Sequence, residues 1–367
     1  PDAPGALRHE RMGDVDVERF TYFLPRDRQC LAYGNGIRDN LRGSFAAKLQ
    51  PPPFIACQAA ATRSLARRRD VAVVNSHWII PQGLSTALAR GRRRRFGHVL
   101  TVHAGDVYLL QSLPFGRALA RFVAARSDVV SAVGSHVRDS LDALLGRPSN
   151  AALQPMGANV GAFREGPPEP SAADRFPSGY LLFFGRFSEK KGTVYLLRAL
   201  PRVLERHGGL GLVVIGYGAL EDSLRAEARA LGIEHAVDFV GRKNHEEIGR
   251  YLRGCRLAVV PSIVDSKGET EGMPTVVVEA LASGTRVVAS RVDGIPDVIR
   301  HRENGWLCAE KDPGDLAEKI LVALDDPPDS RVLTRGAQTA DALDWSAVAA
   351  HYAEIFERVA ADRARGA

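Results

Sequence analysis

The stretch EGMPTVVVEALASGTRVVAS, residues 271–290, places a helix and a strand directly after a turn. Pro274 suits the first position of a helix, because its missing N–H group and fixed φ cost nothing there. The run 275–282 is apolar and helix-forming, and Gly284 is a stop signal, since glycine tolerates the left-handed conformation that ends many helices. TRVVAS, 285–290, is typical of a short buried strand. The stretch therefore predicts a loop, a helix and a strand in succession.

The start of this helix is a candidate anion site. Free N–H groups and the helix dipole favour a negative charge at Gly272 and Met273, and glycine lets a ligand approach the backbone closely. Glu271 lies at the mouth of that site and Glu279 lies deeper. Carboxylates accept hydrogen bonds from hydroxyl groups, so the pattern indicates a ligand with both phosphate and hydroxyls. The alternative is that Glu271 only complements the helix dipole and Glu279 is a solvated helix residue.

Strand and helix signals alternate along the rest of the chain, in two series. The breaker-rich segment 166–179 lies between them and is typical of a linker. The expected strands are 70–75, 98–103 and 128–133 in the first series, and 180–185, 210–216, 236–241, 256–261 and 285–290 in the second. Two such series predict two doubly wound parallel sheets that bind ligands at the carboxyl ends of their strands. We expect the amphipathic segment 344–364 to be a helix that packs back across the domains.

Length and composition fit two cytosolic domains. The 367 residues allow two domains at roughly 150 residues each, and a hydrophobic content of 45% allows a core in both. No apolar run is long enough to span a bilayer. The cysteines are scattered and none forms a pair at metal-ligand spacing, which favours a reducing cytosol and argues against a zinc site or disulfides. They are Cys30, Cys57, Cys255 and Cys308.

The positive charge is concentrated in the first half of the chain. Residues 1–165 contain 23 Lys and Arg against 13 Asp and Glu, and the runs RRR at 67–69 and RGRRRR at 90–95 carry much of that excess. Each run alone is typical of solvated helix ends. Together they make an anionic membrane surface a candidate partner, at roughly 1 kcal/mol per basic residue. We expect no nucleic-acid partner, because no aromatic-interleaved basic motif accompanies the charge.

The second series carries candidate phosphate ligands at the end of its first strand. Arg186 and Lys191 follow Gly185, and two cations beside a helix start provide what a diphosphate needs. The alternative of ordinary surface charge fits Lys190 better than Arg186.

Two later strand ends carry weaker signals. Gly216 and Gly218 form a turn that lacks the third glycine and the acid of a dinucleotide fingerprint, so it predicts close approach to a phosphate or a base. Arg242 follows the next strand in VGRKNHEEI, 240–248, whose backbone is suited to pair with a nucleobase edge.

Candidate residues in the first series lie at two neighbouring strand ends. His103 leaves a buried strand and is followed by Gly105 and Asp106, which favour a role in binding a substrate hydroxyl over the structural role that a lone histidine usually has. His77 and Trp78 are candidates for an acceptor surface, with core packing as an equal alternative.

Taken together, these elements resemble glycosyltransferase family 4, retaining enzymes of the GT-B fold. The motifs that carry the resemblance are HAGD at 103–106, GRFSEKKG at 185–192, GYGALEDSL at 216–224, EGMPTVVVEALASG at 271–284 and VDGIPDVI at 292–299. The resemblance covers nearly the whole chain and implies two Rossmann-like doubly wound parallel-sheet domains facing a cleft. The implied domains are an acceptor-side domain over 1–164, a nucleotide-sugar-binding domain over 165–343 and a closing helix over 344–367.

By that resemblance the donor is a nucleoside-diphosphate hexose, GDP- or UDP-linked, with no metal and no other cofactor, because cations and amides replace the ion. The implied donor-binding residues are Gly185, Arg186, Lys191, Gly216, Gly218, Arg242, Glu271, Gly272, Met273, Pro274, Thr275 and Glu279. Within this set, Arg186 and Lys191 would bind the diphosphate and Glu279 the ribose hydroxyls. The implied catalytic residues are His103, Glu271, Arg186 and Lys191, and the implied acceptor contacts are His77, Trp78 and Asp106.

The implied reaction transfers a hexose with retention to a glycan or lipid-linked acceptor in cell-surface polysaccharide or glycolipid synthesis. We expect a cytoplasmic protein, peripheral at the inner membrane face. Two alternatives are a nucleotide-sugar epimerase of the same fold and a non-catalytic nucleotide-sugar-binding fragment. One departure from the family concerns residues 1–23, which resemble the region after the strand, glycine-rich loop and helix with which members begin. We therefore expect the chain to lack that start and the acceptor side to be incomplete.

Overall fold

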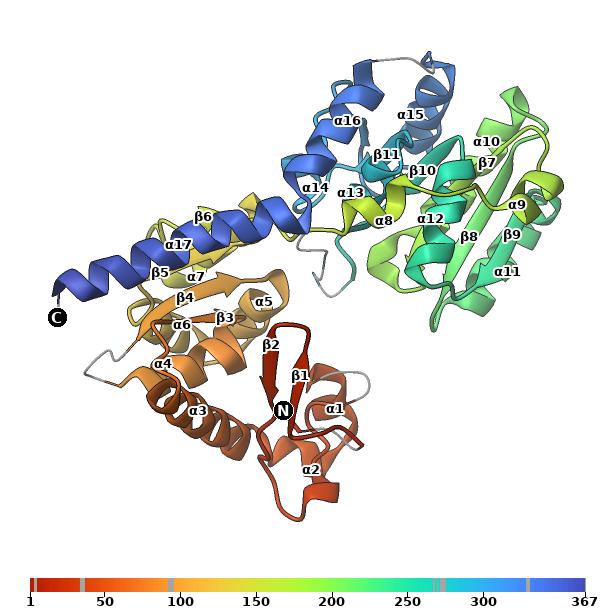
Figure 1. Cartoon of the computed structure of the whole chain (residues 1–367). Helices are drawn as coiled ribbons and strands as arrows, with labels where there is room; N and C mark the ends of the chain where they lie inside the picture. Colours follow the sequence, from red (N-terminus) through yellow and green to blue (C-terminus); the bar gives the residue numbers. More distant parts are fainter. Residues whose placement is uncertain are drawn as a thin grey trace. The chain divides into compact units, whose positions relative to one another are not determined.

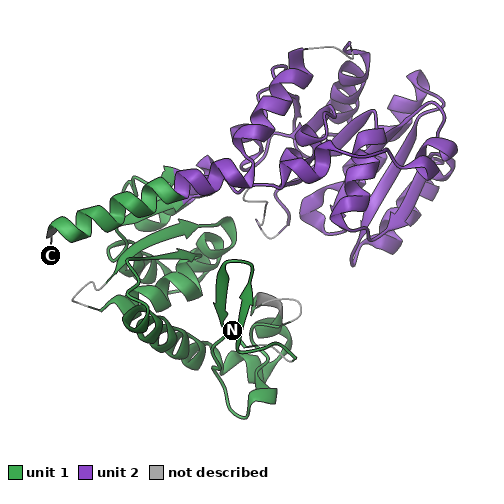
Figure 2. Cartoon of the chain, in the orientation of Figure 1, with its two compact units in different colours: residues 1–131, 141–152, 353–367 green, residues 132–140, 153–352 purple. Residues whose placement is uncertain are grey.

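The computed structural model describes residues 1–2, 5–33, 37–91, 96–266, 268, 270, 275–327 and 331–366. These residues form two compact units, which are described separately (Figure 2). Unit 1 contains residues 1–131, 141–152 and 353–367, and unit 2 contains residues 132–140 and 153–352.

Unit 2 is built on a six-stranded sheet in the order β12-β11-β10-β7-β8-β9 (Figure 1). The strands are β7 (Tyr180–Arg186), β8 (Gly211–Tyr217), β9 (Val237–Gly241), β10 (Leu257–Val260), β11 (Val287–Ser290) and β12 (Trp306–Cys308). Each neighbouring pair is parallel. From β7 the chain runs to one edge of the sheet, and from β10 it runs to the other. The crevice between the carboxyl ends of β7 and β10 is therefore the switch point, where doubly wound sheets bind their ligands.

Helices cover both faces of this sheet. They are α8 (Val160–Arg164), α9 (Pro170–Arg175), α10 (Thr193–Arg206), α11 (Glu221–Ala230), α12 (His245–Gly254), α13 (Thr275–Ala282), α14 (Ile295–Val298), α15 (Pro313–Asp325) and α16 (Arg331–Ala342), with the 3-10 turns η3 (Glu189–Lys191) and η4 (Glu234–Ala236). The strands carry apolar side chains on both faces of the sheet. On one face, Leu181 and Phe183 pack with α10, α11 and α15. On the other, Leu182 and Phe184 pack with α8, α12 and α13. A sheet buried on both faces explains why its strands are continuous apolar runs in the sequence.

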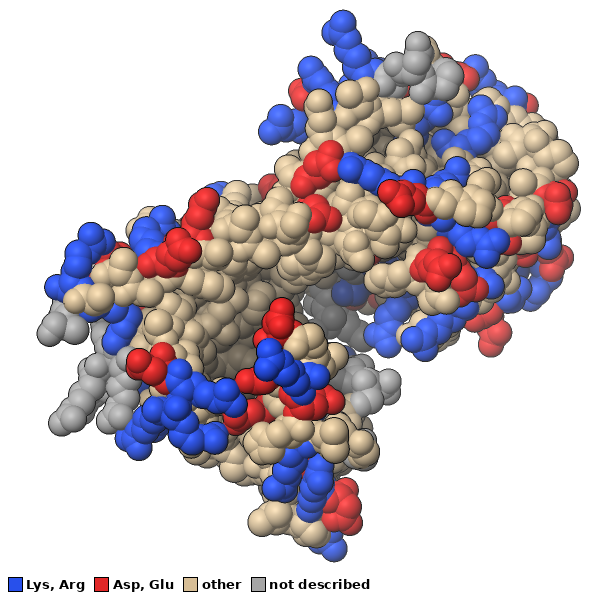
Figure 3. Space-filling view, in the orientation of Figure 1, with Lys and Arg blue, Asp and Glu red and all other residues tan. Residues whose placement is uncertain are grey.

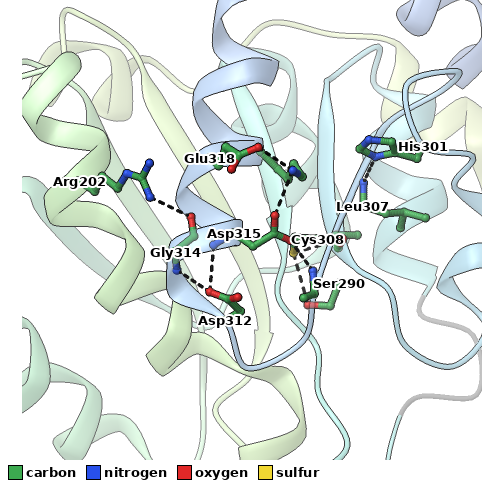
Figure 4. A network of polar contacts seen from close by, with 12 residues as sticks. Arg202, Ser290, His301, Leu307, Cys308, Asp312, Gly314, Asp315 and Glu318 are labelled. Carbon is green, nitrogen blue, oxygen red and sulfur yellow. Dashed lines mark hydrogen bonds and ion pairs between the residues drawn. The ribbon is translucent and has the colours of Figure 1, made fainter.

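The edge strand β12 is joined to α15 by a polar network (Figure 4). Asp312 caps the helix, because its Oδ1 accepts hydrogen bonds from the N–H groups of Gly314 (2.9 Å) and Asp315 (3.0 Å). Asp315 in turn accepts from the N–H of Ala309 (2.6 Å) and pairs with Lys319 (3.0 Å). The network satisfies a helix end within the chain, so we assign it to stability.

Most of unit 1 is built around a four-stranded sheet in the order β3-β4-β5-β6, in which β3 and β4 are parallel; the last residues of β5 and β6 and the first half of α7 are counted in unit 2. Its strands are β3 (Val73–His77), β4 (Gly97–Val102), β5 (Val129–Ala132) and β6 (Ala152–Leu153). The helices that follow or connect them are α3 (Pro51–Arg68), α4 (Leu84–Arg90), α5 (Ala104–Ser112), α6 (Gly116–Ala124) and α7 (Ser135–Leu145), with the irregular turn η2 (Ile79–Gly83).

The C-terminal helix α17 (Trp345–Gly366) begins in unit 2 and ends in unit 1. Within unit 1, Ile355 and Val359 pack against Val99 of β4, and Arg363 donates a hydrogen bond to the carbonyl oxygen of Phe96 (3.0 Å). Its apolar stripe is therefore buried on the sheet, as its amphipathic sequence requires.

The first fifty residues form a separate small cluster of unit 1. It contains the antiparallel hairpin β1 (His9–Met12) and β2 (Val15–Glu18), the turn η1 (Arg26–Arg28), and the helices α1 (Ile37–Gly43) and α2 (Phe45–Lys48). The rings of Phe20 and Tyr22 lie edge-on to Phe54 of α3, with centres 5.2 and 4.9 Å apart. Aromatic packing therefore attaches this segment to α3.

The predicted fold class is confirmed. Each strand expected in the two series is present, and α13 has the predicted bounds, Thr275–Ala282. The segment 166–179, which we expected to be a linker, contains α9, because Pro170 occupies the first turn of a short helix. The hairpin and the short strands β6 and β12 were not predicted, since the hairpin strands are polar and largely exposed and the other two strands are only two and three residues long.

Two further findings concern membrane-spanning helices and disulfide bonds. Among the described residues, none of the helices combines the length and the apolar character needed to cross a bilayer. All four cysteines are free thiols.

His98 of β4 is a fully buried titratable group in unit 1. Its Nε2 lies 2.7 Å from Oγ of Ser76, and its Nδ1 lies 3.2 Å from Oγ of Ser127. Burial lowers the pKa of His98 to about 4, so the ring is neutral at neutral pH.

Replacement of His98 by Asn should reduce the sensitivity of unit 1 to acid. The pKa is 6.5 when the group is unperturbed, as in the unfolded chain, so that chain binds more protons between pH 6.5 and pH 4. The free energy of unfolding should therefore fall as the pH drops through this range, by up to about 3 kcal/mol for this group. Urea unfolding at neutral pH and at about pH 5 measures the difference. A variant that loses stability as steeply as the wild type would contradict the assignment.

Candidate functional site

The carboxyl ends of β7, β8 and β9 bring predicted ligand-binding residues side by side. The register of the sheet pairs Gly185 with Gly216 and Arg186 with Tyr217. Arg242 follows β9, and its Cζ lies 5.2 Å from the centre of the Tyr217 ring. Arg186, Tyr217 and Arg242 are all exposed. The carboxyl ends of these strands therefore present two guanidinium groups and an aromatic ring to solvent.

Packing within the chain explains why glycine stands at Gly216, near the end of β8, and at Gly218, directly after it. A Cβ on Gly216 would lie 1.9 Å from the carbonyl oxygen of Gly185, and one on Gly218 would lie 2.5 Å from the carbonyl oxygen of Phe187. Contacts within the chain thus require glycine at both positions, whether or not a ligand also approaches them. That a ligand does so stays a prediction.

The turn after β7 packs against the end of β10 across the switch point. Gly192, directly after η3, has φ of +64°, and a Cβ there would lie 1.8 Å from the carbonyl oxygen of Pro261. Only glycine satisfies both the conformation and the contact. A Cβ on Gly185 would lie 3.6 Å from Cε of Lys191, so the lysine side chain runs along the end of β7.

Glu279 of α13 is a buried carboxylate beside this turn. It is 8% exposed, and burial raises its pKa. Nearby His245, a hydrogen bond with the side chain of Thr275 and the charge of Lys191 act in the opposite direction and favour the ionised form. The structure therefore brings together three residues predicted to bind the same ligand, Lys191, Thr275 and Glu279. A buried acid beside a lysine at a switch point is typical of a functional site.

His245 was not predicted from the sequence. It is the first residue of α12, whose N-cap Asn244 accepts a hydrogen bond from the N–H of Glu247 (2.9 Å). Its ring centre lies 6.1 Å from that of Phe163. His245 follows the end of β9 by a few residues and so lies at the carboxyl end of the sheet, like the predicted residues. This position was the one feature of the sequence from which a role for His245 could have been predicted.

The predicted residues Glu271, Gly272, Met273 and Pro274 lie outside the described residues, so their roles stay predictions.

A second group of predicted residues lies in unit 1, at the ends of β3 and β4. Nδ1 of His77 lies 3.0 Å from Nε2 of His103, and the ring of Trp78 stacks on His103 with centres 5.7 Å apart. A Cβ on Gly105 would lie 3.2 Å from the Trp78 ring, so glycine leaves the indole its place. Burial lowers the pKa of both histidines, that of His103 to about 4. The three side chains thus form an aromatic cluster that is uncharged at neutral pH.

Asp106, a predicted acceptor contact, is fully buried. Its carboxylate accepts hydrogen bonds from the N–H of His103 (3.0 Å) and the N–H of Ile79, and so fixes the start of α5 against η2. Burial raises its pKa to about 7, although these bonds favour the ionised form. In the structure, the carboxylate of Asp106 binds the backbone N–H groups of His103 and Ile79. Its contact with an acceptor stays a prediction.

The described residues offer cations and hydroxyl acceptors for ligand binding. No group of three or more His, Cys, Asp or Glu side chains among them could hold a metal ion. Arg186, Lys191 and Arg242 supply positive charge, and Glu279 supplies a carboxylate. Such a set can bind a phosphorylated ligand that also carries hydroxyl groups.

The basic runs of the sequence are partly engaged within the chain. Arg68 and Arg69 pair with Glu18 and Asp16 at 3.1 and 3.0 Å, and Arg90 is 1% exposed. Figure 3 shows acidic side chains beside basic ones on the face that it displays. Residues 92–95 lie outside the described residues, so the described part of the two runs only shows that Arg68, Arg69 and Arg90 are engaged within the chain.

Two family models match the chain. The model described as glycosyl transferases group 1 matches residues 175–340, and the one described as glycosyltransferase family 4 matches residues 14–162.

Several curated proteins are similar to this chain in sequence. An uncharacterised glycosyltransferase of Methanocaldococcus jannaschii is 24% identical over 95% of this chain and 92% of its own. A glycogen synthase of Mycobacterium tuberculosis is 30% identical over 77% of this chain and 68% of its own. A GDP-mannose-dependent alpha-(1-6)-phosphatidylinositol monomannoside mannosyltransferase of the same species is 26% identical over 66% of this chain and 64% of its own.

Among solved structures, the Anabaena protein HepE in complex with UDP is 18% identical, with a TM-score of 0.68 over 85% of this chain and 83% of that chain. At this identity the likeness shows a shared fold.

Replacement of Gly216 by Ala should destabilise unit 2 by about 3 kcal/mol, because a Cβ there forces β7 and β8 apart. Gly161→Ala is the matched control: the nearest atom to a Cβ at this position in α8 lies 3.9 Å away, so its effect should stay within about 1 kcal/mol. Urea unfolding of both variants measures these changes. Equal stability of the two would show that the strand ends tolerate a side chain.

Proposed function

The chain belongs to glycosyltransferase family 4 and has the GT-B fold, and we propose that it transfers a hexose from a nucleoside-diphosphate sugar to a glycan or lipid-linked acceptor. The observation that carries this proposal is the group formed by Lys191, Thr275, Glu279 and His245 at the switch point of unit 2. A buried acid and basic side chains at that place match the two parts of a nucleotide sugar, hydroxyl groups and diphosphate.

The donor is GDP- or UDP-linked. Arg186 and Lys191 bind its diphosphate, and Glu279 accepts hydrogen bonds from its ribose hydroxyls. Relatives support a nucleotide donor, because HepE was solved with UDP and the mannosyltransferase is named as GDP-mannose-dependent. Arg242 and Tyr217 lie at the same edge of the sheet and are available to the base.

The transfer retains the configuration of the hexose. The bond between C1 and the diphosphate oxygen breaks, its electron pair stays on the diphosphate, and the acceptor oxygen bonds to C1 on the same face. The acceptor oxygen is itself the nucleophile, so the protein supplies none, and the acceptor proton passes to the leaving diphosphate. Arg186 and Lys191 stabilise the charge that develops on the leaving group, and no metal ion is needed.

The hexose and the acceptor involve other predicted residues. Glu271 lies beside the hexose, and His103 contacts it as a neutral hydrogen-bonding partner, since burial lowers its pKa to about 4. His77 and Trp78 face the acceptor. The names of the relatives, a glycogen synthase and a phosphatidylinositol monomannoside mannosyltransferase, support glycans and lipids as acceptor classes. We place the protein in the cytoplasm, peripheral at the inner membrane face.

The test of this function is a panel of UDP- and GDP-hexoses in the presence of EDTA. We expect nucleoside diphosphate release that depends on an added glycan or glycolipid acceptor, and NMR should show the donor's anomeric configuration in the product. Epimerised donor without release, donor binding without turnover, an inverted product or strict dependence on a metal ion would each contradict the proposal.

Arg186→Ala and Lys191→Ala should each weaken binding of UDP or GDP by about tenfold or more, because a charge-assisted bond to phosphate is lost. Binding of uridine or guanosine should change little. Lys190→Ala, in the same turn, is the control for removal of a positive charge. Calorimetric titration measures all four ligands. Equal losses for nucleotide and nucleoside would remove the diphosphate role from these residues.

Glu279→Gln should weaken binding of the ribonucleotide by about tenfold while leaving the fold intact. The wild type should prefer the ribonucleotide over its 2′-deoxy form, and the variant should lose that preference, since the carboxylate is the hydroxyl acceptor. Glu318→Gln, on the exposed side of α15, is the matched control. A variant that still discriminates against the deoxynucleotide would show that the ribose is bound elsewhere.

A further inference from the structure

The loop that follows β10 is held from the other side of the switch point. It connects β10 to α13 through residues 261–274, which is long for a connection in an α/β unit. The N–H of Ile263 donates a hydrogen bond to the carbonyl oxygen of Lys190 (2.9 Å), so the start of the loop runs along η3.

Glu189 makes a two-point contact with this loop. Its Oε1 accepts from the N–H of Ser266 (2.8 Å), and its Oε2 accepts from the hydroxyl of Ser266 (2.7 Å). Charge-assisted bonds of this kind are stronger than neutral ones, and two of them fix direction as well as distance. Glu189 therefore ties η3 to the loop two residues before Lys191.

The turn η3 needs such an anchor. Its own bonds are those from the N–H of Lys191 to the carbonyl oxygen of Ser188 and from the N–H of Gly192 to that of Glu189, each 3.0 Å. A single helical turn is not stable alone. Its orientation thus depends on contacts with the surrounding loops.

We propose that Glu189 is a positioning residue for Lys191: by binding Ser266 across the switch point, it fixes the turn from which Lys191 reaches the donor diphosphate. The inference rests on the proposed function, which assigns the diphosphate to Lys191. It adds a residue that shapes the phosphate site without touching the ligand.

The charge of Glu189 by itself predicts the opposite effect. A carboxylate close to a diphosphate repels it, so removal of the charge alone should strengthen binding. Anchoring needs hydrogen-bonding groups rather than charge. The amide in the Glu189→Gln variant can accept from the N–H of Ser266 and donate to its hydroxyl. Charge and anchoring therefore affect binding with opposite signs and can be separated.

The experiment is calorimetric titration of UDP and GDP, with uridine and guanosine as phosphate-free comparisons. Glu189→Ala should weaken nucleotide binding by about fivefold and leave nucleoside binding unchanged, whereas Glu189→Gln should bind the nucleotide at least as tightly as the wild type. In a Lys191→Ala background, Glu189→Ala should cause no further loss, because its effect passes through Lys191. Ser266→Ala, which keeps the backbone donor, should fall between the wild type and Glu189→Ala.

Thermal unfolding separates positioning from loss of structure. Glu189 and Ser266 are both exposed, so Glu189→Ala should melt close to the wild type and to the control Glu318→Ala.

Tighter nucleotide binding by Glu189→Ala, or the same loss with and without Lys191, would overturn the inference and leave the proposed function standing. A wild type that binds UDP and GDP no better than the nucleosides would overturn the proposed function, and this inference with it.

Discussion

The strand order of unit 2, which creates a switch point between β7 and β10, is the constraint on which the candidate nucleotide site depends. Two adjacent parallel strands continue into connections that run to opposite edges of the sheet, so their carboxyl ends cannot be covered by a single crossover. The turn with Lys191 follows one strand, and the helix with Glu279 follows the other. Side chains that lie far apart in the sequence therefore meet at one place because of strand order alone.

The polar groups at this place lower the stability of the fold. Glu279 is nearly buried, and its pKa is raised. The buried hydroxyls of Thr193 and Ser262, which follow β7 and β10, have no hydrogen-bond partner in the described part of the chain. Each such group costs about 1–3 kcal/mol. Polar groups of this kind also occur elsewhere in the described part of the chain, and those beside the switch point fit a binding site there.

The sequence was most informative where one local force decides the structure. Continuous apolar runs predicted the strands of unit 2, and the apolar run 275–282 followed by Gly284 predicted α13. β12 has only three residues, which is too short to show such a pattern. Its pairing with β11 is a tertiary contact that the local sequence does not reveal.

The candidate site could be predicted only in part, because several of its contacts are tertiary and are not encoded in the local sequence. The strand end and the helix start in the sequence singled out Lys191 and Glu279, and the structure brings the two together. Their roles in binding stay predictions. The proximity of His245 to Glu279 is a tertiary contact that local sequence does not encode. Gly216 was expected to serve a ligand, yet the close approach of two strands already requires it. Asp106 was expected to contact an acceptor, yet its carboxylate is buried and accepts hydrogen bonds from backbone N–H groups.

The central claim is that the switch point of unit 2 is the nucleotide site. The most direct test is a crystal structure of the protein with UDP or GDP, whichever binds more tightly. We expect phosphate oxygens within hydrogen-bonding distance of the side chains of Lys191 and Arg186, and ribose hydroxyls within hydrogen-bonding distance of the Glu279 carboxylate. A nucleotide bound at the switch point in the reverse orientation, or at another part of the protein, would contradict this claim.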